Sequence, residues 1–150
     1  MTALTLLGNG ELAAQDRNTI LAQGNAPVRV VEYDARVWGE ELGETIYHDF
    51  RVRNDSDRGI VAVKLGLLCY DVFNEFQDET ETILVKDLSP GERTDFYAMS
   101  YPDQPRAFYT GVIYVRKVRF LDGEIWEAPT EELDALLQEF EASLSSPSDG

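Results

Sequence analysis

Apolar and polar residues alternate with a period of two along much of the chain. The clearest example is residues 45–53, where one set comprises Ile46, His48, Phe50 and Val52 and the other Tyr47, Asp49, Arg51 and Arg53. Successive side chains of a strand point to opposite faces, so this alternation predicts a strand with one buried face. Similar β-branched and aromatic runs cover 28–38, 60–73, 82–86, 94–101, 108–120 and 125–126.

Turn-forming residues separate these runs. Polar residues crowd positions 54–59, Pro90 and Gly91 suit the centre of a type II turn, and Asp122–Gly123 joins two apolar runs as in a tight hairpin. About seven short strands, with no alternation of strands and helices, predict a mainly β protein. We therefore expect an immunoglobulin-like antiparallel β-sandwich.

The hydrophobic period changes after residue 128. Apolar side chains then recur at helical spacing and form one stripe: Leu133, Leu136, Leu137, Phe140 and Leu144. Glu131 and Glu132 lie in the first turn of such a helix, where the helix dipole favours acidic side chains. The pattern predicts an acidic amphipathic helix at 129–144, whose stripe docks either on the sandwich or on a partner.

The terminal segments differ in composition from the predicted sandwich domain at 27–128. Residues 1–26 are rich in Ala, Asn, Gln and Gly, and they predict either a small hairpin or an arm that orders against a partner. Residues 145–150 predict a disordered tail. No segment has the pattern of an export signal or of a membrane span, so we expect a cytoplasmic protein.

The charge is strongly one-sided, with 28 acidic and 13 basic side chains and a formal net charge of −15. Such a chain repels nucleic acid and favours a protein partner with a basic surface. Residues 129–150 hold six acids and no base, so the predicted helix is the first expected contact. The basic residues cluster at Arg106, Arg116, Lys117 and Arg119. In a regular strand Arg116 faces away from Lys117 and Arg119, and we expect salt bridges to neighbouring acids.

Candidate catalytic chemistry is sparse, because the chain has one His and one Cys. His48 falls on the apolar side of its strand, and we expect a core or edge histidine that hydrogen-bonds a backbone carbonyl. Cys69 lies in an apolar run, where a free thiol behaves as a small hydrophobic group. The oxygen-rich segment 54–57 lacks EF-hand spacing and is expected to cap a turn. We predict no catalytic residue, no metal and no cofactor, and a protein that is not an enzyme.

Three segments together resemble the FxLYD type of immunoglobulin-like domain, which occurs in small bacterial accessory proteins. They are 52–60, where a strand ends in Asn54 before a polar turn, 67–71, which ends in Tyr-Asp, and 88–92, which holds the Pro-Gly turn. The sequence departs from the motif at Leu67, where the family has Phe, and at Cys69, where it has Leu. The resemblance spans about 45–126 and implies a β-sandwich without implying an activity.

These observations favour a non-enzymatic protein–protein interaction module, such as an accessory subunit, adaptor or assembly factor. The expected contact residues are Leu133, Leu136, Leu137, Phe140, Glu132, Glu139 and Tyr101. A second copy of the chain is a further partner that the helix stripe allows. Two alternatives stay open: an acidic inhibitor or immunity-type protein that masks a basic site, and a carbohydrate- or ligand-binding domain using Trp38, Trp126 and loop 101–105.

Overall fold

The computed structural model describes residues 17–39 and 43–145, and in these ranges the chain is mainly β, as predicted. The elements are β1 (Asn18–Ile20), β2 (Val28–Trp38), β3 (Thr45–Asn54), β4 (Ile60–Asp71), β5 (Phe76–Leu88), β6 (Arg93–Ser100), the short 3₁₀ helix η1 (Pro105–Ala107), β7 (Phe108–Phe120), β8 (Ile125–Glu127) and α2 (Thr130–Ser145). The described residues thus hold eight strands rather than about seven.

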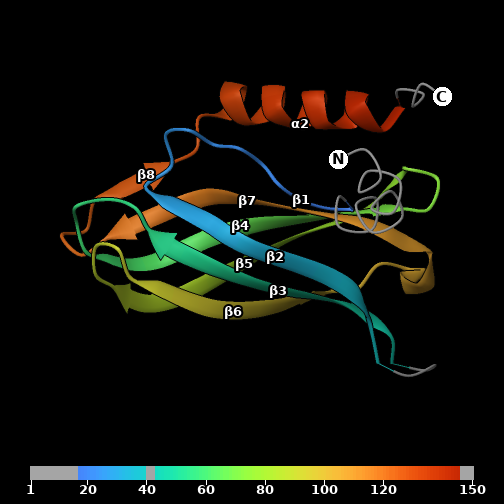
Figure 1. Cartoon of the computed structure of the whole chain (residues 1–150), viewed down its shortest axis with the longest axis horizontal. Coiled ribbons are helices and arrows are strands. Elements are labelled where there is room, and N and C mark those ends of the chain that lie inside the picture. The colour runs from blue at the N-terminus through green and yellow to red at the C-terminus, as the bar shows by residue number, and fades with distance from the viewer. Residues whose placement is uncertain (1–16, 40–42, 146–150) are drawn as a thin grey trace, which may run out of the picture.

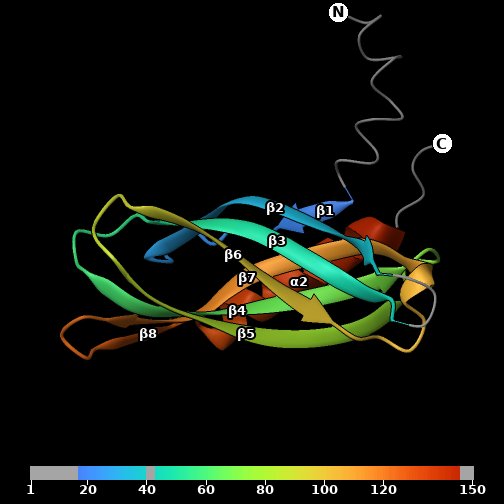
Figure 2. The ribbon, with the colours of Figure 1, turned by 90° about the horizontal axis from the view of Figure 1, so that it is seen from below.

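The strands form two sheets that pack face to face. Sheet A has the order β1-β7-β4-β5, with β8 paired to β7, and sheet B has the order β2-β3-β6. Neighbouring strands are antiparallel except β1, which runs parallel to β7. Figure 1 shows α2 on the side of sheet A that faces away from sheet B, and Figure 2 shows sheet B nearest the viewer with α2 behind. The molecule therefore has three layers.

The main core fills the space between the two sheets. Its buried side chains come from the inward positions of both sheets: Val28, Val30, Phe50, Val52, Ile60, Val63, Leu65, Leu67, Leu84, Leu88, Ile113, Val115, Val118 and Phe120. Burying each large aliphatic side chain contributes roughly 1.5–3 kcal/mol relative to leaving it exposed. The apolar positions of the alternating sequence pattern therefore form the interior of the sandwich.

A second apolar cluster lies between sheet A and α2. Leu133 is buried there, and Leu136, Leu137 and the other apolar side chains of the stripe pack against the same cluster. The Tyr70 ring lies 5.5 Å from that of Phe140, and its hydroxyl donates a hydrogen bond of 2.7 Å to Glu141. Of the two surfaces that the sequence left open for the stripe, the structure places it on the chain's own sheet.

Residues 17–26 pack on the sandwich, although the sequence assigned them to the leader segment. β1 pairs with β7 from Asn18 opposite Gly111 onward, and Leu21 is buried in the second cluster. The Gln23 side chain donates to the carbonyl of Val115 and accepts from its N–H, both at 2.8 Å. The hairpin considered for the first residues, and the tail at 146–150, lie outside the described residues.

Gly111 is required where β2 of sheet B approaches β7 of sheet A. A Cβ at this position would overlap the Tyr33 hydroxyl and the Ala35 methyl group, both on β2. The missing side chain therefore lets the two sheets close at this end of the sandwich, where β1 also joins sheet A.

Asn54 joins two turns at the other end. Its fully buried side chain donates to the carbonyls of Arg58, at 2.8 Å, and Leu88, at 3.0 Å. Its backbone carbonyl accepts from Gly91 at 2.7 Å. The polar turn after β3 and the Pro-Gly turn after β5 are thus fixed by one residue, and Gly91 adopts the positive φ of 83° expected at its turn position.

Two local features differ from the regular strands that the sequence predicts. β5 begins at Phe76, six residues before the predicted start, because β4 provides hydrogen-bonding partners along the acidic stretch that local propensity disfavours. β7 contains a bulge opposite Lys64 and Leu65, at Arg116. An extra residue in a strand shifts the alternation, so Arg116 lies on the outer face beside Lys117, and the predicted opposite orientation is wrong.

Candidate functional site: the outer face of sheet B

The exposed face of sheet B carries a cluster of aromatic side chains, here called the aromatic face: Trp38, Tyr47, Tyr97 and Tyr101. The Tyr47 ring lies between those of Trp38, at 5.9 Å, and Tyr97, at 5.5 Å. Trp38 is 51% exposed, Tyr97 57% and Tyr101 72%. Large aromatic rings left in contact with water on one sheet face are typical of a binding surface.

A guanidinium already lies on this face. The Arg36 guanidinium is 4.8 Å from the centre of the Tyr47 ring, and the Asp34 carboxylate holds it at 2.6 Å. Cation–π contacts of this kind contribute about 0.5–1 kcal/mol at exposed sites. The arrangement shows that the rings and carboxylates of this surface can together bind a basic side chain.

Carboxylates lie in the adjoining rows of the sheet. Asp49 of β3 is directly opposite Asp34 of β2 on one side and Tyr97 of β6 on the other. Arg36 compensates Asp34, whereas Asp49 has no ion-pair partner among the described residues. Like charges directly opposite each other destabilise a sheet, so the Asp34–Asp49 pair favours an additional cation at this place.

A hollow of about 290 Å³ lies beside these carboxylates, and Arg51 is among the residues that line it. Arg51 binds Asp95 at 2.7 Å and Glu32 at 3.3 Å. Its hydrogen bond lowers the pKa of Asp95, which keeps that carboxylate ionised. The hollow therefore keeps an acidic lining with one cation already in place.

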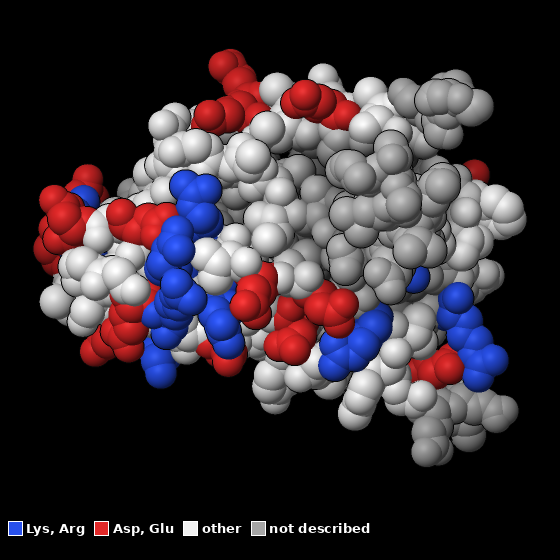
Figure 3. Space-filling model, viewed as in Figure 1, with Lys and Arg blue, Asp and Glu red and all other residues white. Residues whose placement is uncertain are grey.

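The far end of the same face is basic. Arg29, Arg53 and Arg93 lie in one cross-strand row, and Asp55 accepts from the first two. Figure 3 shows basic side chains in a column at one end of the sheet, with acidic ones between that column and the other end. Sheet B is thus graded along its strands, from basic through acidic to aromatic.

A buried polar cluster lies beneath the aromatic face. His48 Nδ1 is hydrogen-bonded to the Tyr33 hydroxyl at 2.9 Å, and its Nε2 to the Ser100 hydroxyl at 2.8 Å. Burial lowers the pKa of His48 to about 4 and raises the pKa of Cys69, 3.9 Å away, to about 12. His48 and Ser100 are both fully buried, so neither side chain of this histidine–serine pair reaches the molecular surface. The expected carbonyl partner of His48 is replaced by two hydroxyls.

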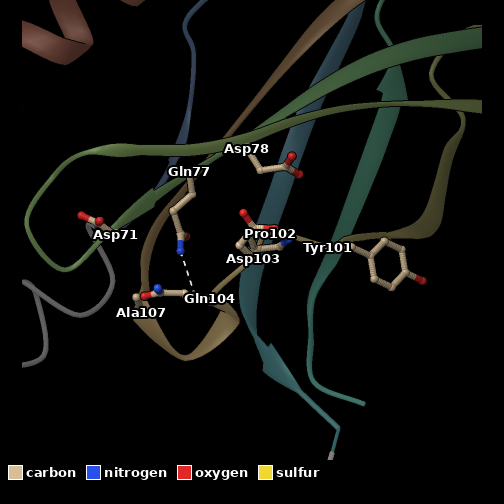
Figure 4. Close-up of a pocket in the computed structure, with 8 residues that line it drawn as sticks. All are labelled: Asp71, Gln77, Asp78, Tyr101, Pro102, Asp103, Gln104 and Ala107. Carbon is tan, nitrogen blue, oxygen red and sulfur yellow. Dashed lines mark hydrogen bonds between the residues drawn. The ribbon is translucent and has the colours of Figure 1, made fainter. Parts of the chain in front are cut away.

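A polar pocket of about 400 Å³ lies near the end of β6 (Figure 4). The Gln77 amide donates to the carbonyl of Gln104 at 2.9 Å, and Asp71 accepts the backbone N–H groups of the turn that follows it. Figure 4 shows the Tyr101 ring directed away from the other lining side chains. In the described part of the chain, no group of three or more His, Cys, Asp or Glu side chains is placed to hold a metal ion.

The other sequence-predicted residues fall in separate places. Glu132 and Glu139 are exposed on α2, whereas Leu133 of the same helix is buried. Trp126 lies on sheet A and packs against both apolar clusters, so the structure does not bring it together with Trp38. None of the helices in the described ranges is long and apolar enough to cross a membrane.

Sequence reasoning missed Tyr47 and Tyr97 as site residues. Alternation already placed Tyr47 on the polar side of its strand, but the pairing that brings Tyr97 beside it joins residues far apart in the chain. The salt bridges expected for the basic residues form at Arg106, which binds Glu44 at 2.8 Å, and at Arg116, which binds Glu81 at 2.7 Å. The expectation is wrong for Lys117 and Arg119, which have no ion pair within the described ranges.

Comparison with solved structures supports the fold. A hypothetical protein from Peptoclostridium difficile 630 is similar with a TM-score of 0.56 and 10% identity, covering 79% of this chain and 93% of that chain. A structural-genomics target has a TM-score of 0.50 at 14% identity, covering 71% and 83%. A DUF1425 family member from a Shewanella species has 0.43 at 15%, covering 63% and 83%. At these identities the first two likenesses show a shared β fold alone.

No protein-family model matches the sequence, and no curated protein matches it.

Proposed function

We propose that the chain is a non-enzymatic interaction module, an adaptor or accessory subunit, that binds a protein partner through the aromatic face. The observation that carries the proposal is the run of Trp38, Tyr47 and Tyr97 in ring contact on an open sheet. Trp and Tyr are enriched among the residues that dominate binding energy, since they bury much area at low entropic cost.

The partner contributes basic side chains. Asp49 lies beside Tyr97 without an ion-pair partner among the described residues, and the contact of Arg36 with Tyr47 has the geometry that a partner's Arg or Lys would repeat. The net charge of −15 attracts such a partner from a distance. Residue types and long-range charge therefore favour the same class of partner.

We further propose that the domain belongs with the FxLYD type. Support comes from Asn54, which binds both the polar turn and the Pro-Gly turn that carry the resemblance. The one cysteine of the chain, Cys69, is free and buried. A free thiol of this kind is suited to a reducing compartment such as the cytoplasm.

The test uses two short peptides with the same apolar anchor, one rich in Arg and Lys and one with Gln in their place. Each is titrated into the ¹⁵N-labelled full chain, and amide shifts are followed by NMR. We expect the basic peptide to shift amides of β2, β3 and β6. The double substitution Trp38→Ala with Tyr97→Ala should weaken this binding roughly 10- to 30-fold, as loss of central interface residues does.

The matched control is Ile83→Ala with Ile125→Ala, which removes similarly exposed side chains from the other sheet and should leave binding unchanged. Shifts confined to α2 would overturn the proposal in favour of an acidic inhibitor that binds through its helix. Binding of neutral oligosaccharides that requires Trp38 would overturn it in favour of a carbohydrate-binding domain.

A further inference from the structure

One end of the outer face of sheet A is left uncovered by α2, and we call it the bare end. It is formed by side chains from four strands: Ala62, Lys64, Ile83, Val85, Lys117, Arg119 and Ile125. Ile83 and Ile125 are each about half exposed, and Val85 is 76% exposed. Apolar side chains gathered in this way on a sheet face are typical of a surface that another element covers.

The bare end is also basic, in a chain whose formal net charge is −15. Lys117 and Arg119 have no ion-pair partner among the described residues, and Lys64 shares Glu81 with Arg116. The bulge in β7 brings Arg116 to this same side. A shallow hollow of about 140 Å³ lies between these cations and the exposed isoleucines.

The neighbouring half of the outer face of sheet A is acidic where the bare end is basic, and it protrudes where the bare end is hollowed. α2 stands on it as a ridge, with Glu131, Glu132, Asp134, Glu139 and Glu141 and no basic residue. Figure 1 shows the helix over one part of the sheet, with the β8 end left open, and Figure 3 shows acidic side chains alone over the helix. One face of the molecule thus holds an acidic ridge beside a basic recess.

We propose that a second copy of this chain covers the bare end, in a two-fold dimer that places each α2 over the bare end of the other copy. A two-fold interface requires one surface that is complementary to itself, and a ridge and a recess of opposite charge side by side meet that requirement. Both contacts form together, because the rotation that places one helix in one recess also places the other.

The dimensions agree with this arrangement. A helix of 16 residues is about 24 Å long and about 10 Å wide. The bare end spans four strands, roughly 14 Å across at the usual strand spacing. The stretch of β4 before Gly66, Ile60–Leu65, is roughly 20 Å long, and its side chains on the outer face are Ala62 and Lys64. Ala135, on the side of α2 opposite Leu133, gives the ridge a small residue where the partner's sheet would approach it.

The dimer leaves the aromatic face free on both copies, so it is independent of the proposed function. The net charge of −15 on each chain opposes self-association at a distance, and the local complementarity of ridge and recess must overcome that repulsion. Charge substitutions therefore test the proposal more directly than changes of salt do.

The experiment is sedimentation velocity of the full chain across micromolar concentrations. We expect the wild type to dimerise and Lys117→Glu with Arg119→Glu to weaken the dimer roughly tenfold or more, since acid then faces acid. The matched control, Arg29→Glu with Arg93→Glu, makes the same change of net charge on sheet B and should leave the dimer intact.

A charge exchange sharpens the test. Glu132→Lys with Glu139→Lys places two cations on one side of α2, seven residues apart, and should weaken the homodimer to a similar extent. Mixing this variant with the Lys117→Glu/Arg119→Glu variant should restore a one-to-one dimer, because both ridge–recess contacts are then complementary. A monomeric wild type, a dimer that survives the bare-end reversal, or a mixture that stays monomeric would each overturn the proposal.

Discussion

Strands β3 and β4 follow each other in the chain but differ in how their residues are buried. Along β3, buried and more accessible residues alternate from Ile46 to Asn54, as in a strand with one covered face. Along β4 the alternation holds only as far as Leu65, and every residue from Gly66 to Tyr70 is buried.

The difference comes from α2, which covers the outer face of sheet A only over the second part of β4. The covered part begins at Gly66. A Cβ there would overlap the Tyr114 ring, which packs in the second apolar cluster between sheet A and α2. Before Gly66 the outward residue of β4 is Lys64, on the bare end. The burial along a single strand thus shows where its sheet is covered and where it is open.

The largest expected effect is on the covered part. Leu133→Ala should lower the free energy of unfolding by about 2–5 kcal/mol, because it opens a cavity between helix and sheet. Urea denaturation measures the loss, and Gln138→Ala, on the exposed side of the same helix, should change it by less than about 0.5 kcal/mol. Equal losses of unfolding free energy for the two substitutions would show that packing of the α2 stripe on sheet A does not stabilise the protein.

The next largest expected effect is a pH dependence of stability, and it comes from His48 on the inner face of β3. Its pKa is about 4 in the folded chain and 6.5 when exposed, so between these values the unfolded state binds the extra proton. The free energy of unfolding should therefore fall by about 3 kcal/mol as the pH drops from 6.5 to 4. Below pH 4 both states bind the proton, so His48 causes no further loss.

Urea denaturation at several pH values measures this slope. His48→Gln removes the titrating group while every carboxylate stays, so the variant should lose the His48 part of the slope between pH 6.5 and 4. An unchanged slope in the variant would contradict the assignment. The chain has no other histidine that could account for it.

The smallest expected effect is on the open face. Tyr97→Ala removes ring contacts with Tyr47 and Phe96 and should cost about 0.5–1.5 kcal/mol in thermal denaturation. Tyr101→Ala removes a side chain without a ring partner in the described residues and should change stability by less than about 0.5 kcal/mol. A loss as large as that of Leu133→Ala would mean that the aromatic face is structural.

Helices and strands could be predicted from the sequence where their hydrophobic pattern repeats over several periods. The stripe from Leu133 to Leu144 indicated a helix at 129–144, and the structure has Thr130–Ser145. β1 was missed because three residues are too few to show alternation, and its pairing depends on β7, more than 90 residues later. Local propensity likewise understated β5, whose acidic first half is held by β4.

The candidate site could be predicted less well than the fold. The sequence named Tyr101 as a contact residue and Trp38 only in the carbohydrate-binding alternative, where a buried core position was the simpler expectation; the structure leaves Trp38 51% exposed. The cluster also needs Tyr47 and Tyr97, which strand register brings together. Register is set by the packing of whole strands, and single-strand patterns do not contain it. The bulge at Arg116 is a further case, since it changes which charges share a face.

Asn54 has a consequence for how the molecule opens. Its backbone N–H donates to the carbonyl of Glu92 at 2.9 Å, and its side chain donates to the carbonyl of Leu88, so the β3–β4 and β5–β6 connections, which both cross between the sheets, share one buried residue. Neither connection can open at this end without breaking hydrogen bonds of the other. The two sheets are thereby linked into one cooperative unit, and the amide protons of Asn54 and Gly91 should exchange with solvent only when the whole sandwich unfolds.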